Sequence, residues 1–145
     1  MNSLLAKKLI FWGALLFLIG VLQGAIVPYF TNTRMALSAH LAAVQSGMAL
    51  MIFGAIWQHI QLSAKMLTTT YISSIASMYL IWMGLTLAAV LGTSKATPIA
   101  GAGFQASPAQ EILVEAIITL GAVAGIVASV LIVLGLYRNV KNHSE

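Results

Sequence analysis

Four long apolar runs are the feature of this sequence that most constrains its fold. They cover about residues 9–30, 37–57, 70–91 and 112–136, and three polar breaks separate them. Each run has about 20 residues or slightly more, enough for a helix to cross a hydrocarbon layer roughly 30 Å thick. Inside lipid every backbone N–H and C=O must be paired within its own segment, so each run is predicted to be helical. We therefore expect an all-α fold, a single membrane domain over residues 1–145 with a bundle of four transmembrane helices.

The composition agrees with a membrane protein and excludes several other classes. Hydrophobic residues make up 60% of the 145 residues and charged residues only 7%, whereas soluble domains have about 25% charged residues. These values rule out a cytosolic globular enzyme, a disordered chain and a nucleic-acid-binding protein. The sequence contains no cysteine, which excludes disulfides, thiolate metal sites, iron–sulfur clusters and catalytic thiols.

The distribution of Lys and Arg predicts the orientation of the helices. Two of these residues, Arg34 and Lys95, lie on one side of the predicted spans, and five lie on the other side. Because Lys and Arg are enriched in cytoplasmic loops, we expect both termini to face the cytoplasm. The five residues on the expected cytoplasmic side are Lys7, Lys8, Lys65, Arg138 and Lys141.

Two glycine pairs predict where helices approach each other closely. Gly20 and Gly24 form one pair in the first run, and Gly121 and Gly125 form another in the fourth. Small residues at this spacing let two helix backbones come together. Packing within one chain and packing between subunits both account for such pairs, and packing within the chain is the simpler interpretation.

The longest connection, residues 92–108, is predicted to be more than a linker. It is rich in Gly, Ala and Pro but also carries Ile99 and Phe104, so we expect it to fold back over the mouth of a pocket. At its end, Ser107 is placed to cap the last helix together with Gln110.

The polar residues inside the apolar runs lie mostly in the half of the membrane that is predicted to face outward. The inner half is almost purely apolar, and random placement would not favour this asymmetry. Tyr79 lies near the middle of the third run, and Trp82 lies one turn further outward. The outer half contains His40, Glu115, Gln23, Gln45 and Ser46. This asymmetry predicts a cavity in the outer half.

His40 is the candidate ligand for a cofactor, because it lies about one turn below the predicted outer surface. Ionisable residues inside a membrane are costly and often functional. A neutral imidazole is a good ligand for iron, and a haem needs only one axial histidine, whereas an all-protein zinc site needs several ligands. We interpret His40 as a ligand of haem iron. The alternative is an interfacial histidine that extends into water.

Tyr79, Glu115, Gln45 and Ser46 are the candidate catalytic residues. Glu115 lies beyond the first turn of its helix, where the helix dipole no longer stabilises a charged carboxylate, so it is a candidate general acid. Tyr79 is either a donor to a substrate oxygen or a packing aromatic residue. Gln45 and Ser46 lie about 100° apart around their helix, so at most one of them can fully face the cavity beside the histidine.

The residues in two segments resemble a known family. Residues 34–41 (Arg-Met-Ala-Leu-Ser-Ala-His-Leu), continued by Gly47 and Met48, resemble the second span of the bacterial hydroxylaminobenzene mutases. Residues 98–104 and 107–111 resemble their third loop and fourth span. The resemblance covers essentially the whole chain. It implies an isomerase of the bacterial inner membrane that converts hydroxylaminobenzene, a small aromatic substrate, to 2-aminophenol by intramolecular oxygen transfer.

A more distant similarity is to the membrane styrene oxide isomerases. They carry a comparable His followed by Gly-Met seven and eight positions later, which matches His40, Gly47 and Met48. By this similarity His40 ligates the iron of haem b, which acts as a Lewis acid, and the protein is a homotrimer. Their Asn six positions after the His is Ser46 here, and this chain has no Asp to match theirs. Tyr79 is a candidate counterpart of their tyrosine.

Three other functions stay open at the level of the sequence. A small four-span exporter of lipophilic cations would use a membrane carboxylate to exchange substrate for protons, but the small multidrug transporters carry that carboxylate in the first span, where this chain has none. An epoxide isomerase of the styrene oxide isomerase type is the second. The third is an assembly protein in which His40 and Glu115 are structural.

Overall fold

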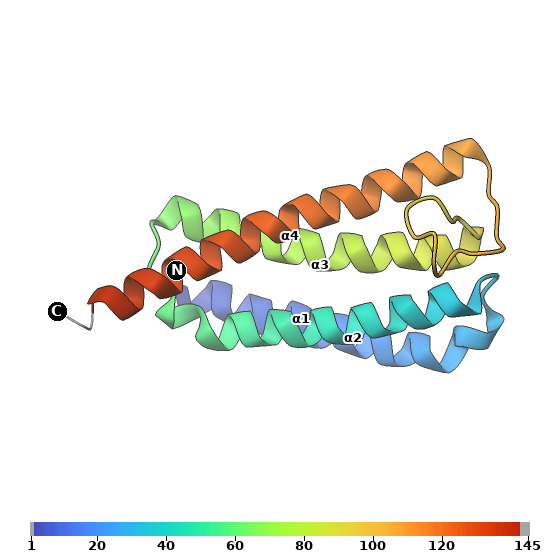
Figure 1. Cartoon of the computed structure of the whole chain (residues 1–145). Helices are drawn as coiled ribbons and strands as arrows, with labels where there is room; N and C mark the ends of the chain where they lie inside the picture. The colour runs from blue at the N-terminus through green and yellow to red at the C-terminus, as the bar shows by residue number, and fades with distance from the viewer. Residues whose placement is uncertain (1, 143–145) are drawn as a thin grey trace.

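The structure, a computed structural model, describes residues 2–142 and consists of four long helices (Figure 1). Each of the four is long and apolar enough to cross a membrane, so the predicted all-α architecture with four spans is confirmed. Two short 3-10 segments, η1 and η2, follow the first and second helices. In chain order the elements are α1 (Asn2–Ile26), η1 (Val27–Tyr29), α2 (Thr33–Ile56), η2 (Trp57–His59), α3 (Ala64–Leu91) and α4 (Pro108–Asn142).

The apolar runs locate the helices but underestimate their lengths. The first helix begins at Asn2 rather than near residue 9, and the fourth has 35 residues and begins at Pro108 rather than near residue 112. The difference has a physical cause, because a run of apolar residues marks only the part of a helix that lies in lipid. Backbone hydrogen bonding continues beyond it into the interface and water.

The helix ends follow from local capping residues. The side chains of Asn32 and Ser63 accept hydrogen bonds from the backbone N–H groups three residues later, at the starts of α2 and α3. Gly92 ends α3 with φ of 68°, a left-handed conformation that favours glycine. Ser107 and Gln110 bond reciprocally before α4, as the sequence predicts.

The four helices pack as two antiparallel pairs. Helix α1 packs along α2, and α3 packs along α4 (Figure 1). The two pairs are joined mainly through α2 and α3, whereas α1 and α3 make few close contacts. The 92–107 connection lies at one end of the bundle, and the helix ends nearest the termini lie at the other.

Glycines set the closest contacts within each pair. A Cβ on Gly20 would lie 2.7 Å from the Cβ of Ala43, and one on Gly121 would lie 2.9 Å from the side chain of Ile81. Both glycine pairs identified in the sequence therefore pack within the chain. At Gly47 the two backbones themselves come close, since a Cβ there would lie 2.6 Å from the backbone nitrogen of Phe17.

Replacing Gly47 with alanine should destabilise the protein by about 1–3 kcal/mol, the range for an overpacked core. The added methyl group would meet backbone atoms of α1, which cannot rotate away. Gly84→Ala is the matched control, because its methyl group would meet only side chains of α4 and should cost less. Unfolding of both variants in detergent micelles measures the difference. Equal destabilisation would contradict a special role for the α1–α2 contact.

Candidate functional site

A groove of about 510 Å³ lies between α1 and α3, where these two helices make few close contacts. Its walls are mostly apolar, and its polar groups come from one residue of α1 and two of α3. It lies in the part of α1 that is nearer the 92–107 connection. The lining includes Ile19, Leu22, Gln23, Phe30, Trp82 and Thr86. A mostly apolar groove with a few convergent polar groups is typical of a site for a small molecule.

The polar groups of the groove form one hydrogen-bonded chain. The indole N–H of Trp82 donates to Oε1 of Gln23 over 2.7 Å, and Nε2 of Gln23 donates to Oγ1 of Thr86 over 3.1 Å. The Gln23 side chain is buried, and an amide buried within a membrane helix needs such partners from a neighbouring helix. Trp82 and Thr86 lie one turn apart on α3, which presents both to the same amide.

A row of aromatic rings continues from the groove toward the terminal end of the bundle. Tyr79 lies edge-to-face against Trp82 with ring centroids 6.3 Å apart, and edge-to-face against Trp12 at 6.2 Å. The hydroxyl group of Tyr79 donates to the carbonyl oxygen of Trp12 over 2.9 Å. Tyr79 therefore belongs to the same α1–α3 surface as the groove. It lies one helical turn from Trp82, toward the end of the bundle that carries the termini.

His40 lies at the contact between α1 and α2. Its Nδ1 is 2.7 Å from the carbonyl oxygen of Gly20. A carbonyl only accepts, so Nδ1 carries the proton and the lone pair of the neutral ring lies on Nε2. Gly24 leaves room for the ring, because a Cβ there would lie 2.8 Å from Cε1 of His40. Histidines that bind metals often have their second ring nitrogen held in this way by a backbone carbonyl.

The structure brings some of the sequence-predicted residues together and keeps others apart. Tyr79 shares a surface with the groove, whereas His40 packs on the side of α1 that faces α2. Ser46 is buried and Gln45 is exposed on the outer face of α2, in agreement with the prediction that they cannot both face one cavity.

Glu115 lies near the end of the bundle that carries the 92–107 connection. Its carboxylate pairs with the ammonium of Lys95 over 2.6 Å, and both side chains are exposed. This hydrogen bond and the negative charge of Glu115 raise the pKa of Lys95 above its ordinary value. Glu111 accepts hydrogen bonds from the backbone N–H groups of Ser94 and Lys95. The two glutamates thus hold the start of the connection against α4.

The 92–107 connection folds back on the bundle through polar contacts, whereas Ile99 is 87% exposed, and the described lining of the α1–α3 groove includes no residue of the connection. Asn32 donates from its side-chain amide to the carbonyl of Ala100 over 2.9 Å, and Arg34 donates to the carbonyl of Ile99 over 3.2 Å. The connection therefore covers the start of α2 and the turn before it.

Sequence reasoning missed the hydrogen-bonded chain in the groove. It placed Gln23 and Trp82 in the outer half of the membrane but did not pair them, and it did not consider Thr86. The sequence does contain an indication of this contact. Trp82 and Thr86 are four residues apart and so lie on one face of their helix, and Gln23 is an amide within an apolar helix that needs a hydrogen-bond partner. The partner helix of Gln23, however, depends on tertiary packing.

Comparison with known proteins identifies the family. The family model for styrene oxide isomerase matches residues 5–137. The chain belongs to this family. Hydroxylaminobenzene mutase HabA of Ectopseudomonas oleovorans is 31% identical to the family member described here over 127 residues, which are 87% of this chain and 94% of HabA. Hydroxylaminobenzene mutase HabB of the same organism is 33% identical over 111 residues, 76% of this chain and 68% of HabB. No solved structure matches the chain.

The family assignment settles the class of protein. The chain is an isomerase with four candidate membrane spans. The resemblance to the hydroxylaminobenzene mutases and to the styrene oxide isomerases that the sequence motifs indicate is confirmed.

Proposed function

We propose that this isomerase rearranges arylhydroxylamines such as hydroxylaminobenzene to 2-aminophenols by intramolecular oxygen transfer. The observation that carries the proposal is the apolar α1–α3 groove with one internal hydrogen-bonded chain beside Tyr79. The similarity to HabA and HabB supports the substrate class. We place the protein in the bacterial inner membrane with both termini in the cytoplasm, as the Lys and Arg distribution predicts.

The groove suits a small aromatic molecule that dissolves in the bilayer. The aromatic ring packs against apolar walls such as Ile19 and Leu22, and the N–OH group lies at the Trp82 end of the polar chain, next to Tyr79. Such a substrate reaches the groove from the lipid. The apolar walls also keep water away from the cationic aromatic intermediate, which water would otherwise trap.

Tyr79 is the proposed proton donor for breaking the N–O bond. Its hydroxyl group leaves the Trp12 carbonyl and protonates the substrate oxygen as the N–O bond breaks. The oxygen then bonds to the ortho carbon of the ring and returns one proton to Tyr79. The hydrogen displaced from that carbon ends on nitrogen as the ring regains aromaticity. Atoms and electrons balance without an external reductant or oxidant.

We propose that His40 binds haem b through Nε2. The hydrogen bond to Gly20 and the position of the ring over Gly24 fit a histidine that would hold haem iron through its other nitrogen. When bound, the haem iron supplies a Lewis acid for the N–O oxygen. Ser46, buried on the same helix, is the candidate neutral polar group beside it, and Gln45 on the outer face of α2 is placed to reach a neighbouring copy.

His40 and Tyr79 lie on different sides of α1, so one chain does not bring them together. We propose a homotrimer in which His40 of one copy faces the α1–α3 groove of the next. Both regions are at least partly exposed in the single chain, which supports this assembly. In this arrangement Glu115 is not the general acid that the sequence suggests, and it acts instead by holding the 92–107 connection through Lys95.

His40→Ala should abolish haem binding and leave a folded protein. The absorption spectrum of the detergent-purified variant measures this through the Soret band. Gly24→Ala should lower haem occupancy, because its methyl group would displace the His40 ring. Gly121→Ala adds a methyl group in the α3–α4 contact and serves as the control for general packing effects, and His59→Ala should leave the spectrum unchanged. Stoichiometric haem in His40→Ala would refute the assignment.

Tyr79→Phe should lower the rate of 2-aminophenol formation by about 10²–10⁴-fold, the contribution of one general acid. Glu115→Gln should have a smaller effect, because Glu115 is an exposed partner of Lys95. In isotopically labelled water the product should keep the substrate oxygen. Full activity of Tyr79→Phe with normal haem would remove Tyr79 from the mechanism, and solvent oxygen in all of the product would show that water attacks an open intermediate.

Mixing two inactive variants tests whether the site is shared between copies. If His40 and Tyr79 come from neighbouring subunits, co-expressed His40→Ala and Tyr79→Phe chains should recover activity. If the two variants are expressed in equal amounts and assemble at random, each interface has a chance of about one half of receiving an intact His40 and about one half of receiving an intact Tyr79. Roughly a quarter of the interfaces would then carry both intact residues. The double variant, co-expressed with itself, is the control. No recovery in mixed trimers of confirmed composition would place the whole site within one chain.

Isomerisation of an epoxide is the second candidate activity, because the family model that matches residues 5–137 is that of styrene oxide isomerase. Assays of the wild-type protein with styrene oxide and with hydroxylaminobenzene under the same conditions separate the two. A higher kcat/KM for styrene oxide would favour the epoxide.

A further inference from the structure

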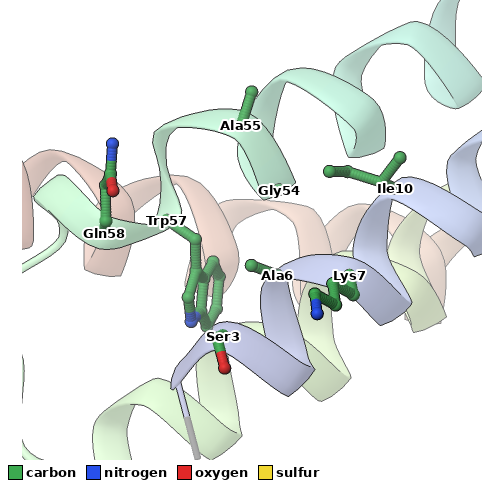
Figure 2. Close-up of a pocket in the computed structure, with 8 residues that line it drawn as sticks. All are labelled: Ser3, Ala6, Lys7, Ile10, Gly54, Ala55, Trp57 and Gln58. Carbon is green, nitrogen blue, oxygen red and sulfur yellow. The ribbon is translucent and has the colours of Figure 1, made fainter.

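A second cavity, of about 500 Å³, lies at the end of the bundle that carries the chain termini (Figure 2). It is formed by the first turns of α1 on one side and by the end of α2 with η2 on the other. It is separate from the α1–α3 groove, because it contacts the first turns of α1 rather than its second half. Its lining includes Ser3, Lys7, Ile10, Gly54, Trp57 and Gln58. Nothing in the proposed isomerisation uses these residues.

Trp57 is the strongest sign that this cavity binds something. Its side chain is 1% exposed, and its indole nitrogen has no hydrogen-bond acceptor among residues 2–142. Figure 2 shows the ring lying against α1 with the nitrogen toward Ser3. A buried N–H group without an acceptor is costly and is rare in folded proteins. The nitrogen atom itself is buried, so a ligand oxygen would reach it only at the innermost wall of the cavity, beside Ser3.

The charges around the cavity specify the kind of ligand. The polar lining groups are a hydroxyl, an ammonium, an amide and the indole N–H, and no carboxylate of residues 2–142 lines the cavity. Lys7 supplies the positive charge, and Ser3 and Gln58 supply further hydrogen-bond donors. This set fits an anionic group with several acceptor oxygens, such as a phosphate.

The polarity of the cavity changes along the bundle axis. Ser3 and Lys7 lie at the start of α1, and Ile10 lies about 10 Å further along the helix than Ser3 and about 4.5 Å further than Lys7, at a rise of about 1.5 Å per residue. Gly54 lies beside Ile10, and no Cβ can occupy this position without meeting Ile10 and the Ala6 carbonyl. A polar mouth with an apolar floor, at the end of a membrane helix, matches a headgroup and the first part of an acyl chain.

We propose that this cavity is a binding site for an anionic phospholipid. The phosphate oxygens accept hydrogen bonds from the Trp57 indole and the Lys7 ammonium, and an acyl chain runs past Ile10 along the α1–α2 pair. Free phosphate shares the same headgroup chemistry. The acyl chain distinguishes the two, because only a lipid uses the apolar floor.

Native mass spectrometry of the full chain in detergent tests this with added phosphatidylglycerol or phosphatidylcholine. Phosphatidylglycerol should bind more tightly. Lys7→Gln should weaken its binding about fivefold, the effect expected for one Lys beside an anionic lipid. Lys8→Gln is the matched control, because Lys8 is the exposed neighbour that does not line the cavity, and it should leave the affinity unchanged. Trp57→Phe keeps a ring but removes the N–H donor and should also weaken binding.

Three outcomes would overturn the proposal. Equal binding of the two lipids would show that the cavity does not recognise the negative charge. Equal losses for Lys7→Gln and Lys8→Gln would show diffuse attraction rather than a site. Displacement of phosphatidylglycerol by inorganic phosphate at the same concentration would show that the acyl chain contributes nothing. If Trp57→Phe does not fold, the two lysine variants still decide the question.

Discussion

The close approach of α1 and α2 is the contact on which the rest of the structure depends. At Gly47 the two backbones are so near that no side-chain atom fits between them. This contact draws α1 toward α2 and away from α3, because a helix cannot lie equally close to two neighbours when only one face is lined with glycine. The gap left on the α3 side is bridged by long side chains, Tyr79 and Trp82, rather than by backbone contact. The groove is therefore a consequence of glycine placement on the opposite face of α1.

The same contact determines the surroundings of His40. The ring lies over Gly24 and its Nδ1 reaches the Gly20 carbonyl, and neither is possible if α1 carries side chains at these positions. The two glycines thus have two roles, since they bring the helices together and also fix the tautomer of the histidine. A substitution at either glycine would therefore change both the orientation of the His40 ring and the packing of α1 against α2.

The sequence predicts the helices well because apolar length and polar breaks are local properties, and lipid allows few alternatives to a helix. It also predicts the cap at Ser107 and that at most one of Gln45 and Ser46 can fully face one cavity, since both follow from spacing along one helix. It could not predict that Glu115 pairs with Lys95 or that Gln23 bonds Trp82. These contacts join segments 20 and 59 residues apart, and they depend on which helix lies beside which. Hydropathy carries no information about that choice.

The hydrogen-bonded chain in the groove has a direction. An indole nitrogen can only donate, so Oε1 of Gln23 must face Trp82, and its amide nitrogen must then face Thr86. The amide cannot turn over without losing the bond to Trp82, because its nitrogen would then face the indole N–H. Because Thr86 accepts from Gln23, its own hydroxyl hydrogen remains at the far end of the chain. The groove therefore presents an oriented row of dipoles, and a molecule that binds at the Thr86 end has to meet it with an acceptor atom. The groove therefore distinguishes the two ends of a largely apolar substrate, because only the end with an acceptor atom can bond to Thr86. The substrate is oriented in this way before the reaction begins.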